Sequence, residues 1–166
     1  RDDVTELVHR RLRLGVDTPH QVGVEGHVGI VGQTPEDGRR VARLDLGDPD
    51  SLERGFTGAQ TVYLVGAVFK HWARDPVKEI YDANIAATRH ALNAAAKCRV
   101  KRIVYVSSLA ATDRLRQPIT EAGWNSDVSN IYFRSKNDSE QLAWQLASRH
   151  GLEMVSVLPA AMLGEH

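Results

Sequence analysis

A tyrosine and a lysine four residues apart are the side chains of this sequence best placed to do chemistry. Tyr132 and Lys136 lie just before a segment, residues 137–149, whose pattern predicts a helix. Residues i and i+4 of a helix share one face, so the phenol and the ammonium can converge on one point. A cation beside a tyrosine lowers its ordinary pKa of ~10, because it stabilises the phenolate. The pair therefore predicts a group that exchanges a proton with a carbinol oxygen, although exposed helix faces carry the same spacing without function.

Alternating strands and helices would hold this pair in place. The patterns predict strands at residues 4–8, 41–46, 61–67, 102–108 and 152–158, and helices that start near residues 49, 76 and 132. Strands that alternate with helices of crossover length favour an α/β fold with a parallel sheet. Ligands of such sheets bind beyond the carboxyl ends of the strands. We therefore expect Ser108, at one strand end, to meet Tyr132 there.

Local signals predict where several elements begin and end. Asp48 suits a helix N-cap and Pro49 the first helical position. Gly151 suits the residue that ends the helix after His150, and Pro159 is expected to stop the last strand.

Composition limits the class of protein. The chain has 166 residues, enough for one domain, of which 42% are hydrophobic and 25% charged, as in an ordinary globular protein. Lys+Arg and Asp+Glu both number 21, so no basic excess points to nucleic acid or to an anionic membrane. A single cysteine, Cys98, excludes an internal disulfide and fits a cytoplasmic protein. No segment has the pattern of a transmembrane helix or a signal peptide, and the histidines lack metal-ligand spacing.

Residues 15–40 are rich in glycine and differ from the rest of the chain. Gly23, Gly26, Gly29 and Gly32 recur at every third position. A phosphate-binding glycine turn needs a strand before it and a helix N-terminus after it, but residues 34–38 would break a helix there. We therefore expect a flexible hairpin or an irregular extended insertion.

Six motifs follow one another from residue 41 to residue 164. They are LDLGDP at 44–49, VYLVGA at 62–67, NIAAT at 84–88, VYVSS at 104–108, YFRSK at 132–136 and LP at 158–159. In this order and spacing they resemble the extended short-chain dehydrogenase/reductase family, in its dihydroflavonol-reductase-like and sugar epimerase/dehydratase branch. The set is far more specific than any one of its motifs.

The resemblance implies a Rossmann-like doubly wound parallel sheet with flanking helices that binds NADP or NAD. In it Ser108 would orient the substrate oxygen, Tyr132 would transfer the proton, and Lys136 would lower the pKa of Tyr132 and hold the nicotinamide ribose. Asn84 completes the implied catalytic set. The implied cofactor-binding residues are Arg10, Asp45, Leu46, Val65, Gly66, Ala67, Lys136 and Pro159. The basic stretch around Arg10 favours NADP, the substrate would be a small carbonyl or alcohol, and the family suggests a homodimer.

The chain also departs from the family pattern. The family opens with a strand and a glycine-rich turn before the strand that residues 4–8 match, and it continues past residue 166 into a substrate-binding region. Within the match, Ala87 stands at a family glycine and Leu158 at a family arginine. We therefore expect residues 1–166 to form one incomplete Rossmann-like domain of a longer protein, with residues 15–40 as an insertion.

Three functions stay open on these residues. The first is a reductase or dehydrogenase that moves a hydride between nicotinamide and a ketone or secondary alcohol. The second is a sugar-nucleotide epimerase or dehydratase, which returns the hydride within one turnover. The third is a truncated, non-catalytic relative. We expect the first for the complete protein, with His71 and Trp72 as further candidates for substrate contact.

Overall fold

The computed structural model describes residues 27–33, 39–70, 72–113, 115, 118–120, 123–127 and 129–160, with side chains from residue 44 onward. The strand expected at residues 4–8 lies outside these ranges. The described elements, in chain order, are β1 (His27–Gln33), β2 (Arg39–Asp45), α2 (Pro49–Phe56), β3 (Thr61–Leu64), the π-helical turn η1 (Val77–Asp82), α3 (Ala83–Lys97), β4 (Arg102–Val106), the 3₁₀ turn η2 (Leu109–Ala111), α4 (Ile131–His150) and β5 (Glu153–Val157). From β3 onward strands and helices alternate, as the α/β prediction requires.

Three parallel strands form the main sheet, in the order β3-β4-β5. Their register places Tyr63 opposite Val104, and Val104 opposite Val155. Helix α3 connects β3 to β4, and α4 connects β4 to β5. Because the strands are parallel, their carboxyl ends meet at one edge, and the residues that follow them gather there.

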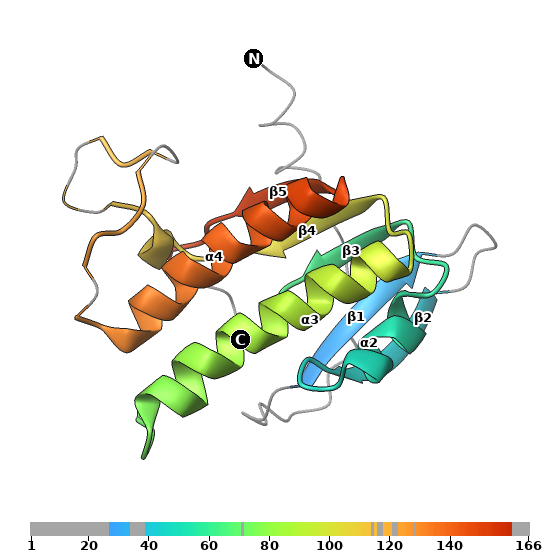
Figure 1. Ribbon diagram of the computed structural model, residues 1–166, viewed down its shortest axis with the longest axis horizontal. Helices are drawn as coiled ribbons and strands as arrows, with labels where there is room; N and C mark the ends of the chain where they lie inside the picture. The colour runs from blue at the N-terminus through green and yellow to red at the C-terminus, as the bar shows by residue number, and fades with distance from the viewer. Residues whose placement is uncertain are drawn as a thin grey trace, which may run out of the picture.

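Strands β1 and β2 form an antiparallel hairpin beside this sheet, with β1 lying between β2 and β3 (Figure 1). Gly29 and Gly32 lie within β1 and pair with Arg43 and Arg40 of β2. These two glycines are therefore part of a strand and not of a turn in front of a helix. Strand β1 also departs from the all-parallel arrangement, since it runs opposite to its partner.

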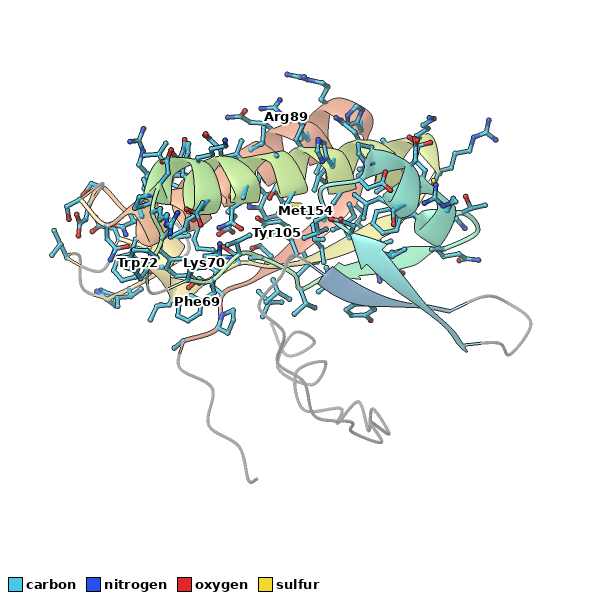
Figure 2. All side chains as sticks on the ribbon, turned by 90° about the horizontal axis from the view of Figure 1, so that it is seen from below. Phe69, Lys70, Trp72, Arg89, Tyr105 and Met154 are labelled. Atoms are coloured by element: carbon cyan, nitrogen blue, oxygen red, sulfur yellow. The ribbon has the colours of Figure 1, made fainter. Side chains whose placement is uncertain are left out.

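Helices α2, α3 and α4 cover the same face of the sheet (Figure 2). The layer between helices and strands holds the hydrophobic core, in which Leu52, Phe56, Val62, Leu92 and Ile103 are at most 1% exposed. The figure shows Tyr105 and Met154 in this layer, whereas Arg89 points away from the sheet. Alanines make up much of the buried side of α3, so α3 can approach the sheet and α4 closely.

The predicted helix ends are confirmed by their hydrogen bonds. Asp48 caps α2 by accepting from the backbone N–H of Asp50, and Pro49 occupies the first turn. Gly151 ends α4 with a φ of 65°, a left-handed conformation that costs glycine least.

Three strands are shorter than expected, and one of them is β5, which spans Glu153–Val157 and not residues 152–158. Strand β3 ends at Leu64 and not at residue 67, because the backbone of Val68 bonds to the Asn84 side chain instead of to a neighbouring strand. Strand β4 ends at Val106, because Ser108 caps η2. These early ends leave a loop after each strand at the carboxyl edge.

No helix in the described part of the chain is long and apolar enough to cross a membrane. The same residues contain no group of three or more histidine, cysteine or acidic side chains that could hold a metal ion.

A matched pair of leucines tests the core. Replacing Leu52, which is fully buried, with alanine should lower the free energy of unfolding by about 2–5 kcal/mol, because a cavity replaces apolar contacts. Leu115 is 85% exposed, and Leu115→Ala should change the free energy of unfolding by less than about 0.5 kcal/mol. Urea denaturation followed by circular dichroism measures both. Equal losses would contradict the placement of α2 in the core.

Candidate active site

Ser108 and Tyr132 come together at the carboxyl edge of the sheet. Ser108 follows β4, and its hydroxyl accepts a hydrogen bond from the backbone N–H of Ala110 at 3.1 Å. Tyr132 lies in the first turn of α4, which Asn130 caps by accepting from two backbone N–H groups. The Ser108 hydroxyl lies close enough to the Tyr132 phenol to lower the pKa of that phenol. The expected meeting of a strand-end serine with the helix tyrosine is therefore present.

The pKa of Tyr132 is raised in this structure, not lowered as the sequence suggested. Burial is the larger cause, because it disfavours the phenolate, and the nearby Ser108 hydroxyl acts in the opposite direction. Phe69 packs edge-on against the tyrosine ring, with 5.0 Å between centroids and 75° between planes. The phenol thus sits in a half-buried, aromatic environment.

Lys136 is buried one helical turn beyond Tyr132, with 4% of its surface exposed. Burial lowers the pKa of its ammonium from 10.5 to about 8, and the carboxylate of Glu140 acts against this shift. Among the described residues, no ion pair within 4.0 Å satisfies the charge. A buried lysine without a close counterion is costly to a fold and marks a candidate functional group.

Asn84 braces the edge of the site. Its Oδ1 accepts from the Val68 N–H at 2.7 Å, and its Nδ2 donates to the Val68 carbonyl and to the Ser135 hydroxyl, both at 3.1 Å. The Asn84 side chain is buried and these contacts occupy it. It therefore positions the loop after β3 against the start of α4, and holds the helix that carries Tyr132 and Lys136.

The sequence did not predict a buried polar pair formed by Ser107 and Glu140. The Ser107 hydroxyl donates to Oε2 of Glu140 at 2.5 Å, and the Trp144 indole N–H donates to Oε1 at 3.4 Å. Glu140 is 3% exposed. Its spacing of four residues from Lys136 could have predicted a shared helix face, but nothing in the sequence linked it to Ser107.

The expected cofactor residues lie at the strand ends with different exposures. Val65, at 59%, and Ala67 are exposed past β3, and Gly66 is half-buried between them. Past β2, Asp45 is exposed and accepts from the Gly47 N–H at 2.7 Å. Leu46 is part of the hydrophobic core, so its side chain is not open to a ligand.

Pro159 and Arg10 are the other two predicted cofactor residues. Pro159, past β5, is half-buried, and its carbonyl accepts from the backbone N–H of Leu109 at 3.0 Å. Arg10 lies outside the described residues.

A cavity of about 590 Å³ opens beside the Tyr132 ring. Its apolar walls include Phe69, Trp72, Ile80 and Phe133, and Lys70 lines its edge. Figure 2 shows Phe69, Lys70 and Trp72 together at this end of the sheet. Trp72 was expected to face substrate and lines this cavity, while His71 lies outside the described residues.

A parallel α/β sheet with polar groups gathered past the carboxyl ends of its strands is typical of the Rossmann-like class of fold. A family model described as the NAD dependent epimerase/dehydratase family matches residues 7–166. The chain belongs to that family, and its membership confirms the resemblance drawn from the motifs.

Reductases are among the relatives of the chain. Cinnamoyl-CoA reductase CAD2 of Medicago truncatula is 30% identical over 139 residues, which cover 74% of this chain and 43% of that protein. Anthocyanidin reductase of Arabidopsis thaliana is 29% identical over 140 residues, or 75% of this chain and 41% of that protein. The chain thus spans about two fifths of the length of these relatives.

A solved structure shares the fold. Yeast methylglyoxal/isovaleraldehyde reductase Gre2, complexed with NADPH, superposes with a TM-score of 0.62 at 20% identity, over 70% of this chain and 41% of that one. At this identity the match supports the Rossmann-like architecture alone.

The buried lysine predicts how stability depends on pH. At pH 7 the folded state bears the cost of a charged Lys136, roughly 3 kcal/mol for a pKa of about 8 in the folded chain against ~10.4 when unfolded. Lys136→Met should therefore stabilise the chain at pH 7. Between pH 8 and ~10.4 the unfolded state binds more protons, so the wild type should gain stability and the difference should shrink.

Urea denaturation of both chains between pH 7 and 10 measures this effect. Lys78→Met, at an exposed lysine, is the matched control and should give a difference that does not change with pH. A pH-independent effect of Lys136→Met would contradict the burial of a charged ammonium.

The Asn84 brace predicts a second stability effect. Asn84→Ala leaves the half-buried backbone N–H and carbonyl of Val68 without their partner and removes one of the two hydrogen bonds of the buried Ser135 hydroxyl, and should cost on the order of 2–3 kcal/mol. Asn93→Ala, on the exposed side of the same helix, removes only a contact with His150 and should cost less than about 1 kcal/mol. Thermal unfolding of the two variants compares them, and similar melting temperatures would argue against the brace.

Proposed function

We propose that the complete protein is an NAD(P)-dependent oxidoreductase, which transfers a hydride between nicotinamide and a ketone or secondary alcohol. The observation that carries this proposal is the placement of the Ser108 hydroxyl near the Tyr132 phenol, one helical turn from a buried Lys136. The reductase relatives support it over other chemistries of the family.

The three side chains would divide the work at one oxygen atom. Ser108 would hydrogen-bond the substrate oxygen and orient it, and Tyr132 would donate or accept the proton on that oxygen. The Lys136 ammonium would stabilise the phenolate form as the proton moves, since an opposite charge favours the ionised phenol. The raised pKa of Tyr132 keeps the phenol protonated at neutral pH, which suits a proton donor in carbonyl reduction.

The described residues fit the nicotinamide end of a dinucleotide. Val65 and Ala67 offer exposed apolar surface next to the carboxyl end of β3, which a flat ring can cover. When bound, the nicotinamide supplies the hydride chemistry, and the protein supplies position and electrostatics. Asp45 and Arg10 are the proposed contacts for the adenosine half, and we favour NADP because Arg10 suits a 2′-phosphate.

The cavity beside Tyr132 indicates the kind of substrate. Aromatic and aliphatic side chains wall it, and Lys70 at its edge already pairs with Glu79 at 3.0 Å. An apolar or aromatic carbonyl compound therefore suits it. A homodimer and a cytoplasmic location, both suggested by the sequence, stay predictions.

A sugar-nucleotide epimerase or dehydratase is the second candidate, because the matching family model covers such enzymes. The two candidates differ in net hydride balance. A reductase consumes NADPH or NADH in proportion to product, whereas an epimerase returns the hydride and leaves the absorbance at 340 nm unchanged. Product analysis together with that absorbance separates them.

Conservative variants test the catalytic assignment. Ser108→Ala and Tyr132→Phe should each lower the rate of NADPH-dependent carbonyl reduction by about 10²–10⁴-fold, because each removes one hydroxyl from the proton transfer. Tyr63→Phe, at an exposed tyrosine on β3, is the control and should keep the wild-type rate. Full activity in Tyr132→Phe would refute the proposed site.

Cofactor titration examines the step before chemistry. NADPH and NADH are added to the purified chain, and quenching of tryptophan fluorescence reports binding. We expect saturable binding, with NADPH the tighter ligand. A folded chain that binds neither would leave these residues as a site that is incomplete in this polypeptide.

A further inference from the structure

The buried carboxylate of Glu140 has no positively charged partner within ion-pairing distance among the described residues. Its two hydrogen-bond donors, the Ser107 hydroxyl and the Trp144 indole, are both neutral. Burying an ionised carboxylate in this way destabilises the fold unless an opposite charge nearby offsets the loss of hydration.

Lys136 is the cation that can use this charge. It lies one turn earlier on α4, on the same helix face, and both side chains are at least 96% buried. The ammonium and the carboxylate thus form a loosely spaced pair inside the protein, where screening by solvent is weak.

Ser107 links Glu140 to the other half of the site. The Ser107 backbone N–H donates to the Val157 carbonyl at 2.8 Å, which extends the β4-β5 pairing, while its hydroxyl holds Glu140. Ser108 is the next residue. One carboxylate therefore fixes the end of β4 against α4, the helix that carries Tyr132.

We propose that Glu140 is a positioning residue of this site, which locks the Ser107–Ser108 strand end onto α4 and supplies the negative charge that keeps Lys136 in its ammonium form. This role rests on the proposed oxidoreductase function. It assigns a task to a buried carboxylate that the proposed proton transfer does not itself use.

The other side chains around Lys136 and Glu140 carry hydroxyl groups, and the pKa values of the two tyrosines among them are raised. From β4, Tyr105 faces it, and burial together with the Glu140 charge raises the pKa of that phenol to about 12. From α3, the Thr88 hydroxyl bonds to Tyr105 at 3.1 Å, and the Ser156 hydroxyl of β5 is buried. On α4 the pKa of Tyr132 is raised by burial. Lys136 is therefore the group expected to titrate near pH 8.

The first test measures the pKa of Lys136 by NMR titration of the full chain without cofactor. Lysine is labelled at Cε, and the signal missing in Lys136→Arg is assigned to Lys136. Glu140→Gln keeps the shape and an acceptor oxygen but removes the charge, and should lower the pKa of Lys136 below 8 by about 1 pH unit. Ser107→Ala keeps the charge and should leave this titration unchanged. Glu153→Gln, at an exposed carboxylate paired with Arg102, is the control and should also leave it unchanged.

A wild-type measurement keeps the proposal testable if Glu140→Gln does not fold. The Cδ signal of Glu140 should shift with an inflection near pH 8, and this inflection should disappear in Lys136→Met. An unchanged Lys136 titration in Glu140→Gln, or no inflection at Glu140, would overturn the electrostatic role whether or not the chain turns over substrate.

Steady-state kinetics tests the positioning role. Ser107→Ala should lower kcat by about 10- to 100-fold through misplacement of Ser108, with little change in the KM for NADPH. In Glu140→Gln the alkaline limb of the kcat profile should move to lower pH. Wild-type kcat in Ser107→Ala would overturn the positioning role, whereas a wild type without turnover would refute the proposed function and leave the titration result intact.

Discussion

The polar face of helix α4 is the constraint on which this structure depends. Five polar or charged side chains of the helix are at least 94% buried against the sheet, namely Ser135, Lys136, Asn137, Ser139 and Glu140. Buried polar groups must find partners inside the protein. Two of these partners come from other elements: Asn84 of α3 bonds to Ser135, and Ser107 after β4 bonds to Glu140. These two contacts favour one register of the helix, because a shift would separate Ser135 from Asn84 and Glu140 from Ser107.

That register is what brings the candidate site together. Once Asn84 and Ser107 hold α4, its first turn lies over the end of β4 and Tyr132 meets Ser108. The apolar part of the helix, with Ala143, Leu146 and Ala147 in the core, supplies most of the burial further along. Hydrophobic packing thus anchors the second half of α4, and hydrogen bonds orient the first half.

Sequence patterns predicted the parts of this arrangement that depend on local physics. The caps at Asp48 and Gly151, the buried strands and the crossover helices follow from side-chain shape and apolar spacing. The motifs further predicted that Ser108 and Tyr132 would meet. What the sequence could not predict depends on contacts between distant segments, as with the early end of β3, where the Asn84 side chain captures the Val68 backbone.

The pKa of Tyr132 likewise depends on contacts between distant segments, which the sequence pattern did not predict. The spacing to Lys136 suggested a lowered pKa, whereas burial raises it, since the first turn of α4 packs under Phe69. Strand β1 gives a further case, because its glycines repeat like a phosphate turn. Only its pairing with β2 shows that Gly29 and Gly32 belong to a strand.

The cost of the buried lysine argues that this polar layer is kept for function. A penalty of roughly 3 kcal/mol is a large fraction of the 5–15 kcal/mol by which a domain is typically stable. An apolar side chain at position 136 would pack on the sheet at no such cost, and the Ser107–Glu140 and Asn84–Ser135 contacts would still fix the helix register. Structure alone therefore gives no reason for an ammonium at this place. The proposed proton transfer by Tyr132, one turn away, would give a reason, because a positive charge near a phenol stabilises its ionised form inside a protein.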